Sequence, residues 1–220
     1  MTTNNSNSCK SILLASGEKL SQELQDKIKT MNAGKPTFPS YTRRVRDVFN
    51  LEKPIIDENK SYFLAGFIEG EGSISISCKK NTNAKFGVEL DPVFNITQHV
   101  NGVKHLYFAL ETFQAGRIRY KAGSNATLVF IIEPRKSLQE KVCPFFEKYV
   151  YPQSGASKQI KYKNFKNMLD LFDEHAHKDK ERFINELLPL WDSMRAQQGC
   201  TRETFKSLGE AQDFVRNIKT

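Results

Sequence analysis

The segment Leu64–Gly72 concentrates glycines and carboxylates at a spacing that permits metal chemistry. Gly66 and Gly70 stand four residues apart, so on a helix they share one face and allow a second helix to approach closely. Glu71 follows at the end of that helix. Where two copies pack about a twofold axis, their Glu71 carboxylates meet, and a hard divalent cation suits such paired oxygen ligands. The structural alternative is a helix that stops at glycine and leaves both acids in solvent.

The elements around this segment must place it beside a sheet. Residues 62–70 predict a helix with Ser61 as its cap, and the alternation of residues 73–79 predicts a strand. Two hairpins separated by helices predict an α+β fold in which helices cover one face of an antiparallel sheet. The other predicted strands are residues 87–98, 116–122 and 126–133, and the other predicted helices are residues 18–31, 41–49, 102–113, 137–149, 157–172, 179–198 and 208–218.

The uncovered face of the predicted sheet carries short polar groups mixed with arginine and lysine. An ordinary solvated face is the alternative interpretation, but this mixture is what contacts to phosphates and base edges require. We therefore predict that this face binds nucleic acid through the following residues, taken strand by strand: Ser73, Ser75, Ser77, Lys79, Glu89, Asp91, Asn95, Thr97, Arg117, Arg119, Lys121, Asn125 and Thr127.

Composition agrees with a nucleic-acid partner. The chain has 33 Lys+Arg against 25 Asp+Glu, a net charge of +8, and a sequence pI of about 9.2. Phosphate neutralisation dominates nucleic-acid affinity, whereas binding to an anionic membrane wants a basic amphipathic helix, which is not evident here. No apolar run approaches the ~20 residues of a membrane span. The four cysteines form no CxxC pair, which excludes zinc-ribbon and thioredoxin sites. The sequence offers no pattern for a small-molecule substrate.

The nonapeptide of residues 64–72 resembles the signature of the LAGLIDADG homing endonucleases. Residues 94–101 and 116–119 are further similar stretches. The resemblance implies the αββαββα homing-endonuclease fold, with a saddle-shaped antiparallel DNA-binding sheet. Only one copy of the motif occurs, which is typical of the homodimeric branch. We expect a helical N-terminal appendage over residues 1–56 and an endonuclease domain, with extra C-terminal helices, over residues 57–220.

The resemblance also implies roles for single residues. Glu71 matches the metal-binding acid, and the carbonyl group of Gly70 joins it. Gln98 matches the polar residue that positions the hydrolytic water, with Asn101 nearby, and Lys161 matches a basic residue near the scissile phosphate. The implied cofactor is Mg²⁺, with Ca²⁺ or Mn²⁺ able to replace it in binding.

Two further expectations concern the motif helix itself. Its dimer interface is expected to contain Leu64, Gly66, Phe67 and Gly70. The chain departs from the family signature by having glutamate at both acidic positions, and the longer side chain preserves charge and ligand type. Of the two acids, Glu69 is expected to be structural.

The implied activity is a staggered double-strand break in a long, rare, pseudo-palindromic DNA site, namely the intronless rRNA gene. The alternative is an RNA-binding intron maturase that uses the same scaffold without cleavage. The single motif copy and the intact Glu71 favour the nuclease. The resemblance to intron-encoded members implies an organelle location, in the chloroplast rather than the mitochondrion, and no secretion.

Overall fold

A computed structural model describes residues 13–195 and 204–218 of the chain. Contacts divide the chain into two compact units, which we describe separately: Met1–Leu64 with Ile96–Ile131, and Ala65–Asn95 with Ile132–Thr220. This division follows contacts rather than chain order, so it cuts through secondary-structure elements. The appendage boundary at residue 56 stays a prediction.

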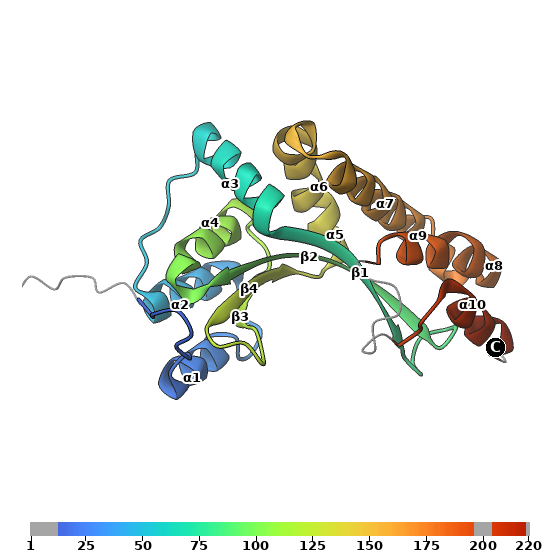
Figure 1. The fold of residues 1–220 in the computed structure, drawn as a ribbon, viewed down its shortest axis with the longest axis horizontal. Helices are drawn as coiled ribbons and strands as arrows, with labels where there is room; N and C mark the ends of the chain where they lie inside the picture. The colour runs from blue at the N-terminus through green and yellow to red at the C-terminus, as the bar shows by residue number, and fades with distance from the viewer. Residues whose placement is uncertain (1–12, 196–203, 219–220) are drawn as a thin grey trace, which may run out of the picture. The chain divides into compact units, whose positions relative to one another are not determined.

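The order of elements confirms the predicted αββαββα fold (Figure 1). The strands form one sheet in the order β1-β2-β4-β3, and β3 pairs antiparallel with β4 from Arg117↔Ile131 to Tyr120↔Leu128. The strands are β1 Gly72–Lys80, β2 Val88–His99, β3 Arg117–Tyr120 and β4 Thr127–Ile132. The helices are α1 Gln22–Met31, α2 Phe38–Phe49, α3 Glu58–Glu71, α4 Val103–Phe113, α5 Arg135–Ser137, α6 Cys143–Phe145, α7 Ala156–Asp173, α8 Lys180–Arg182, α9 Leu188–Ser193 and α10 Leu208–Asn217.

Buried residues alternate with half-buried or exposed residues along the central parts of the strands. In β2 the side chains of Val88, Leu90, Phe94 and Ile96 are buried, as the period of two predicts. β1 and β4 alternate in the same way, with Ile74 and Ile76, and with Leu128, Phe130 and Ile132, as their buried residues. The opposite face of each strand therefore carries the polar side chains.

The motif helix α3 begins one turn earlier than predicted. The Asp57 carboxylate accepts a hydrogen bond from the Lys60 backbone N–H at 2.8 Å, which caps the helix. Ser61 is buried inside the first turns, and its hydroxyl donates to the Asp57 carbonyl at 2.9 Å. The prediction that Ser61 caps this helix is therefore wrong, because an acidic cap lies four residues upstream.

In the first unit, α1 packs beside the edge strand β3, and α4 lies next to the same strand (Figure 1). The side chains of Leu106, Ala109 and Leu110 on α4 are fully buried and form the centre of this core. The N-terminal helices of the predicted appendage thus pack directly on the sheet.

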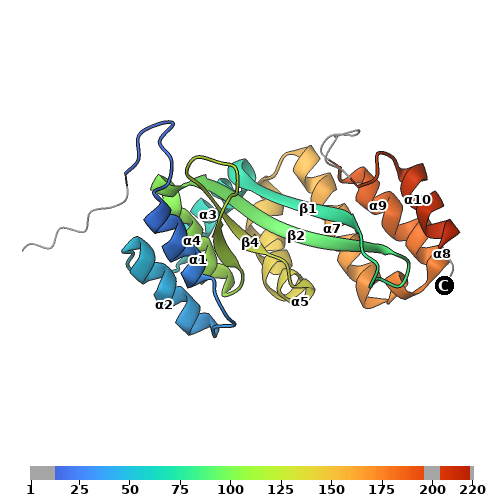
Figure 2. The same cartoon turned by 90° about the horizontal axis from the view of Figure 1, so that it is seen from below.

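In the second unit, α7 and α9 pack against β1. The helical run from Arg135 to Gln153 contains two π-helical stretches, Leu138–Val142 and Phe146–Val150, on either side of Pro144. Proline lacks the N–H that an uninterrupted α-helix needs, so the run is not the single helix predicted over residues 137–149. α8, α9 and α10 lie near the turn of the β1–β2 hairpin (Figure 2). No helix in the described residues is long and apolar enough to span a membrane.

Candidate active site

The carboxylate of Glu71 is exposed at the junction between α3 and β1, where Glu71 is the last helical residue and Gly72 the first residue of the strand. A Cβ atom on Gly72 would lie 2.6 Å from the Ile68 carbonyl oxygen, which is closer than Cβ atoms approach other atoms in proteins. Glycine at this position therefore allows the chain to pass directly from the helix into the sheet. This passage places Glu71 next to the polar face of β1.

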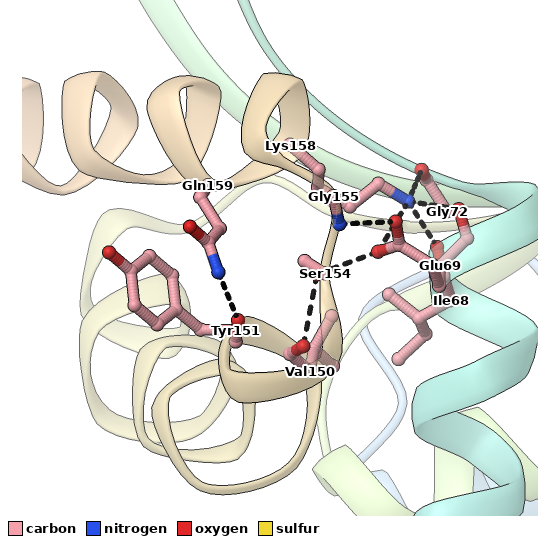
Figure 3. Close-up of polar contacts among 9 residues, drawn as sticks. All are labelled: Ile68, Glu69, Gly72, Val150, Tyr151, Ser154, Gly155, Lys158 and Gln159. Carbon is pink, nitrogen blue, oxygen red and sulfur yellow. Dashed lines mark hydrogen bonds and ion pairs between the residues drawn. The ribbon is translucent and has the colours of Figure 1, made fainter.

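Lys158, near the start of α7, closes the C-terminal end of α3 (Figure 3). Its Nζ atom donates to the carbonyl oxygens of Ile68 at 2.7 Å and Gly72 at 3.3 Å, and also to that of Glu69. The last carbonyls of a helix have no partner within the helix, so a lysine side chain satisfies them and complements the negative end of the helix dipole. Burial lowers the pKa of Lys158, and the nearby charge of Glu69 opposes this effect.

Glu69, near the end of α3, contacts the residues just before α7 (Figure 3). Its carboxylate accepts hydrogen bonds from the Ser154 hydroxyl at 2.6 Å and the Gly155 backbone N–H at 3.2 Å, and it lies 3.6 Å from Lys158 Nζ. Burial alone would raise the pKa of Glu69, but these hydrogen bonds and the charge of Lys158 together hold it below its usual value. Each helix therefore caps the other, and this contact network supports the structural role expected for Glu69.

The remaining carboxylate at this junction is the one suited to a metal ion. Glu71 sits at the negative end of a helix, where an anion is unfavourable without a cation beside it. Its carboxylate and the Gly70 carbonyl are oxygen donors of the kind that Mg²⁺ and Ca²⁺ prefer. Among the described residues, no three His, Cys, Asp or Glu side chains converge on one metal position. The Glu71 carboxylate and the Gly70 carbonyl thus have the donor chemistry that a hard cation needs.

Gln98 lies near the end of β2, and its position depends on a glycine. Its Oε1 atom accepts from the His99 backbone N–H at 2.8 Å. A Cβ atom on Gly102 would lie 2.6 Å from Gln98 Cγ, so any larger residue there displaces this side chain. The water-positioning role of Gln98 stays a prediction, and Gly102 is a residue that the sequence analysis missed.

The structure gives Asn101 a contact that the sequence did not indicate. Its side-chain amide accepts from the backbone N–H of Leu14 and donates to the carbonyl of the same residue, both at 2.9 Å. This two-point contact anchors the N-terminal segment against the end of β2. A role for Asn101 beside Gln98 stays a prediction.

Lys161 lies on α7 one turn beyond Lys158 and is half-buried. The contacts to the end of α3 are made by Lys158, a residue that the sequence analysis did not select. No local pattern signals it, because its acceptors are 86 to 90 residues away in the chain. The role predicted for Lys161 near a phosphate stays a prediction.

The predicted nucleic-acid face is polar and accessible on every strand. Its members are all exposed or half-buried, whereas the residues between them along the central parts of the strands are buried. Several are also held by other parts of the chain. Lys79 pairs with Asp91 at 2.6 Å, and Glu89 accepts from the Asn81 side chain at 2.7 Å. The hydrogen bond from Lys79 to Asp91 raises the pKa of Lys79.

Two members of this face are held by the N-terminal region. The Arg117 guanidinium donates to the Asn32 carbonyl at 2.9 Å, and the Asn125 side chain donates to the Gly17 carbonyl at 3.2 Å. The Asn125 carbonyl also accepts from the Leu20 backbone N–H at 2.8 Å. Neither set of contacts could be read from sequence, because more than 80 residues separate the partners.

The exposed surface of α3 bears on the expected dimer interface. Leu64 is 0% exposed in the single chain, so the prediction that it lies in a dimer interface is wrong: it belongs to the chain's own core. Tyr62 and Phe63 are instead 51% and 54% exposed. A Cβ atom added to Gly66 or Gly70 would meet nothing within 4 Å, so packing within this chain does not require glycine at either position.

Comparisons with known proteins give the family of this chain. The sequence profile described as LAGLIDADG endonuclease matches residues 64–169. The DNA endonuclease I-CeuI of Chlamydomonas moewusii is 50% identical over 210 residues, which cover 94% of this chain and 96% of that protein.

Solved structures show the same similarity. The group I intron-encoded homing endonuclease I-CeuI, complexed with DNA, matches at a TM-score of 0.90 and 48% identity, over 93% of this chain and 100% of that chain. An archaeal intron-encoded homing endonuclease, I-Vdi141I, complexed with DNA, matches at a TM-score of 0.63 and 27% identity, over 72% of this chain and 96% of that chain. The chain therefore belongs to the LAGLIDADG endonuclease family.

Proposed function

We propose that this member of the LAGLIDADG endonuclease family is a homing endonuclease that cuts both strands of a long duplex DNA site as a homodimer. The observation that carries the proposal is the exposed carboxylate of Glu71 at the end of the motif helix. Lys158 fixes this helix end by hydrogen bonds to its carbonyl groups. A structural acid would be engaged by its own chain, as Glu69 is.

The dimer follows from the surface of α3. Exposed aromatic side chains beside two glycines with open space around them form a surface that a second copy of the same helix can cover. Because the chain supplies a single motif, a double-strand break needs two protomers. Two protomers about a twofold axis bring two Glu71 side chains toward the same region and match a pseudo-palindromic DNA site.

The chemistry assigns separate tasks to the residues of the site. Glu71 and the Gly70 carbonyl would hold a divalent ion, for which we propose Mg²⁺. When bound, such an ion activates water and stabilises the negative charge that develops on the phosphate. Gln98 orients the attacking water through its side-chain amide. Lys158 fixes the end of α3 and so fixes the position from which the Glu71 carboxylate projects.

DNA binding rests on the polar face of the sheet. Arg117, Arg119 and Lys121 supply positive charge from β3 and the turn after it, and the short polar groups of β1 supply hydrogen bonds. We further propose that the target is an intronless rRNA gene and that the protein acts in an organelle, the chloroplast in preference to the mitochondrion. Similarity to a group I intron-encoded homing endonuclease supports an intron origin.

The test is cleavage of a DNA fragment that carries the intronless rRNA gene. In magnesium we expect two discrete products, and in calcium we expect a stable complex without efficient cutting, because calcium occupies oxygen sites but suits the chemistry poorly. Sedimentation of the active species should give a dimer. A monomer that cuts both strands, or binding to the intron RNA without any DNA cleavage, would refute the proposal.

A further inference from the structure

The outer edge of β3 is covered by a side chain instead of a neighbouring strand. The Tyr41 hydroxyl, on α2, accepts from the Ile118 backbone N–H at 2.8 Å and lies 3.3 Å from the carbonyl oxygen of the same residue. Edge strands expose unpaired backbone groups that attract other chains, and covering them avoids this. Tyr41 is 3% exposed, so its hydroxyl reaches this edge from inside the core.

Asn32, at the end of α1, also forms hydrogen bonds with β3. Its side-chain amide donates to the Ile118 carbonyl at 2.9 Å and lies 3.2 Å from the Tyr41 hydroxyl. Its own backbone carbonyl accepts from the Arg117 guanidinium at 2.9 Å. Two consecutive residues of β3 are therefore held by the same corner of the N-terminal helices.

The Tyr41 ring also meets the Arg117 side chain. The guanidinium carbon lies 5.8 Å from the ring centroid, within the range of a cation–π interaction. Arginine carries five N–H donors in a rigid fork, so one bond to Asn32 fixes its plane and leaves it able to bond elsewhere. An arginine that is oriented before DNA arrives loses less side-chain entropy when it binds a base edge.

We infer that Tyr41 and Asn32 are positioning residues that hold Arg117 in the orientation from which it reads a base of the DNA target. The inference rests on the proposed function, and it gives the N-terminal helices a part in sequence discrimination. Tyr41 and Asn32 bond the backbone of Ile118, and the Asn32 carbonyl also accepts from Arg117. Their effect on recognition passes through β3 and Arg117.

The experiment compares base preference among variants selected on randomised half-sites, at a temperature where every variant is folded. Tyr41→Phe removes the hydroxyl and retains the ring, and Asn32→Ala provides a second, independent lesion. Tyr162→Phe is the matched control, because the Tyr162 hydroxyl also bonds a backbone carbonyl, that of Cys143 at 3.2 Å, in the other unit.

We expect Tyr41→Phe and Asn32→Ala to reduce discrimination at one position of each half-site by about fivefold or more, the scale of one good arginine–base contact. Tyr162→Phe should leave discrimination unchanged. In an Arg117→Ala background, Tyr41→Phe should have no further effect on base preference, which separates positioning from a general loss of stability.

An unchanged preference in both variants, or equal losses in the control, would overturn the inference while leaving the endonuclease assignment intact. Additive losses in the Arg117→Ala background would also overturn it, because Tyr41 would then act by another route. Failure of the proposed function is a different result: the wild-type protein itself would select no DNA sequence.

Discussion

Among the described residues, the ends of the helices α3 and α10 are each closed by a lysine, and the two ends differ in what lies beside them. Lys158 Nζ bonds carbonyls at the end of α3, and Lys180 Nζ bonds the carbonyls of Arg216 and Ile218 at the end of α10, both at 3.0 Å. In both cases one charged side chain satisfies several backbone acceptors and complements the helix dipole. The capping itself is therefore a structural device.

The difference lies in the acidic residues around α3. That end carries Glu69 and Glu71, and the Lys158 side chain that serves it is only 18% exposed. The end of α10 instead carries Arg216, which pairs with Asp213 at 2.9 Å. Both capping lysines are half-buried, so the α3 end is distinguished by the excess negative charge of its two glutamates. The lysine caps are alike, so the acidic residues beside the α3 cap distinguish the functional helix end from the structural one.

The largest effect is expected from removing the charge that distinguishes the two ends. Glu71→Gln should abolish cleavage, by at least about a hundredfold, because it removes one metal-ligand charge from each protomer. DNA binding should persist, since it rests on the strands. Gel-shift and cleavage assays on the same DNA in magnesium measure both effects, and wild-type cutting by this variant would falsify the metal-site assignment.

Replacing each capping lysine tests whether the cap on α3 contributes to catalysis. Lys158→Met should slow cleavage by about tenfold or more, because loss of charged hydrogen bonds at the α3 end, worth about 1.5–3 kcal/mol each, frees the segment that carries Glu71. Lys180→Met is the matched control and should cost stability without slowing the folded enzyme. Single-turnover cleavage at saturating magnesium, corrected for the folded fraction, is the measurement. Equal rates in the two variants would show that the α3 cap has no catalytic consequence.

Glycines on the same two helices give a third, smaller contrast. Gly66→Ala adds a methyl group in open space, and Gly209→Ala adds one that meets only Ser207 Oγ at 4.0 Å. Each should stabilise its helix by about 0.5–1 kcal/mol in the isolated chain. Only Gly66→Ala should weaken dimerisation, since close helix approach depends on the missing Cβ. Sedimentation at several concentrations, together with thermal unfolding, separates the two effects. A dimer unaffected by Gly66→Ala would place the interface elsewhere.

The smallest effect concerns pH. Because the pKa of Glu69 is lowered in the folded protein, its stabilisation is present above the usual carboxyl value of 4.5 and is lost as pH falls through the folded value. The Glu69 side chain is 38% exposed, so solvent screening limits the effect to less than about 1 kcal/mol. Denaturant unfolding across this pH range should be less steeply pH-dependent in Glu69→Gln. If the free energy of unfolding depends on pH equally in the wild type and in Glu69→Gln, the stabilising role assigned to ionised Glu69 is wrong.

Local patterns were sufficient to predict most elements of the fold. The alternation in β1 and β2 identified their buried faces, because a period of two has no other structural meaning. Predictions failed where a more distant residue decided the outcome. The start of α3 was set by Asp57, and the face of Leu64 was set by packing against the rest of the chain.

The sequence by itself determined the family, the order of elements, and the identity of the acid at the end of the motif helix. These depend on residue types at short spacing, which one chain displays completely. Only the tertiary structure revealed that Lys158 caps α3, that Gly102 makes room for Gln98, and that Tyr41 covers β3. Many lysines and tyrosines along a chain could cap a helix or cover a strand edge. Only the folded structure shows which of them lies close enough to do so.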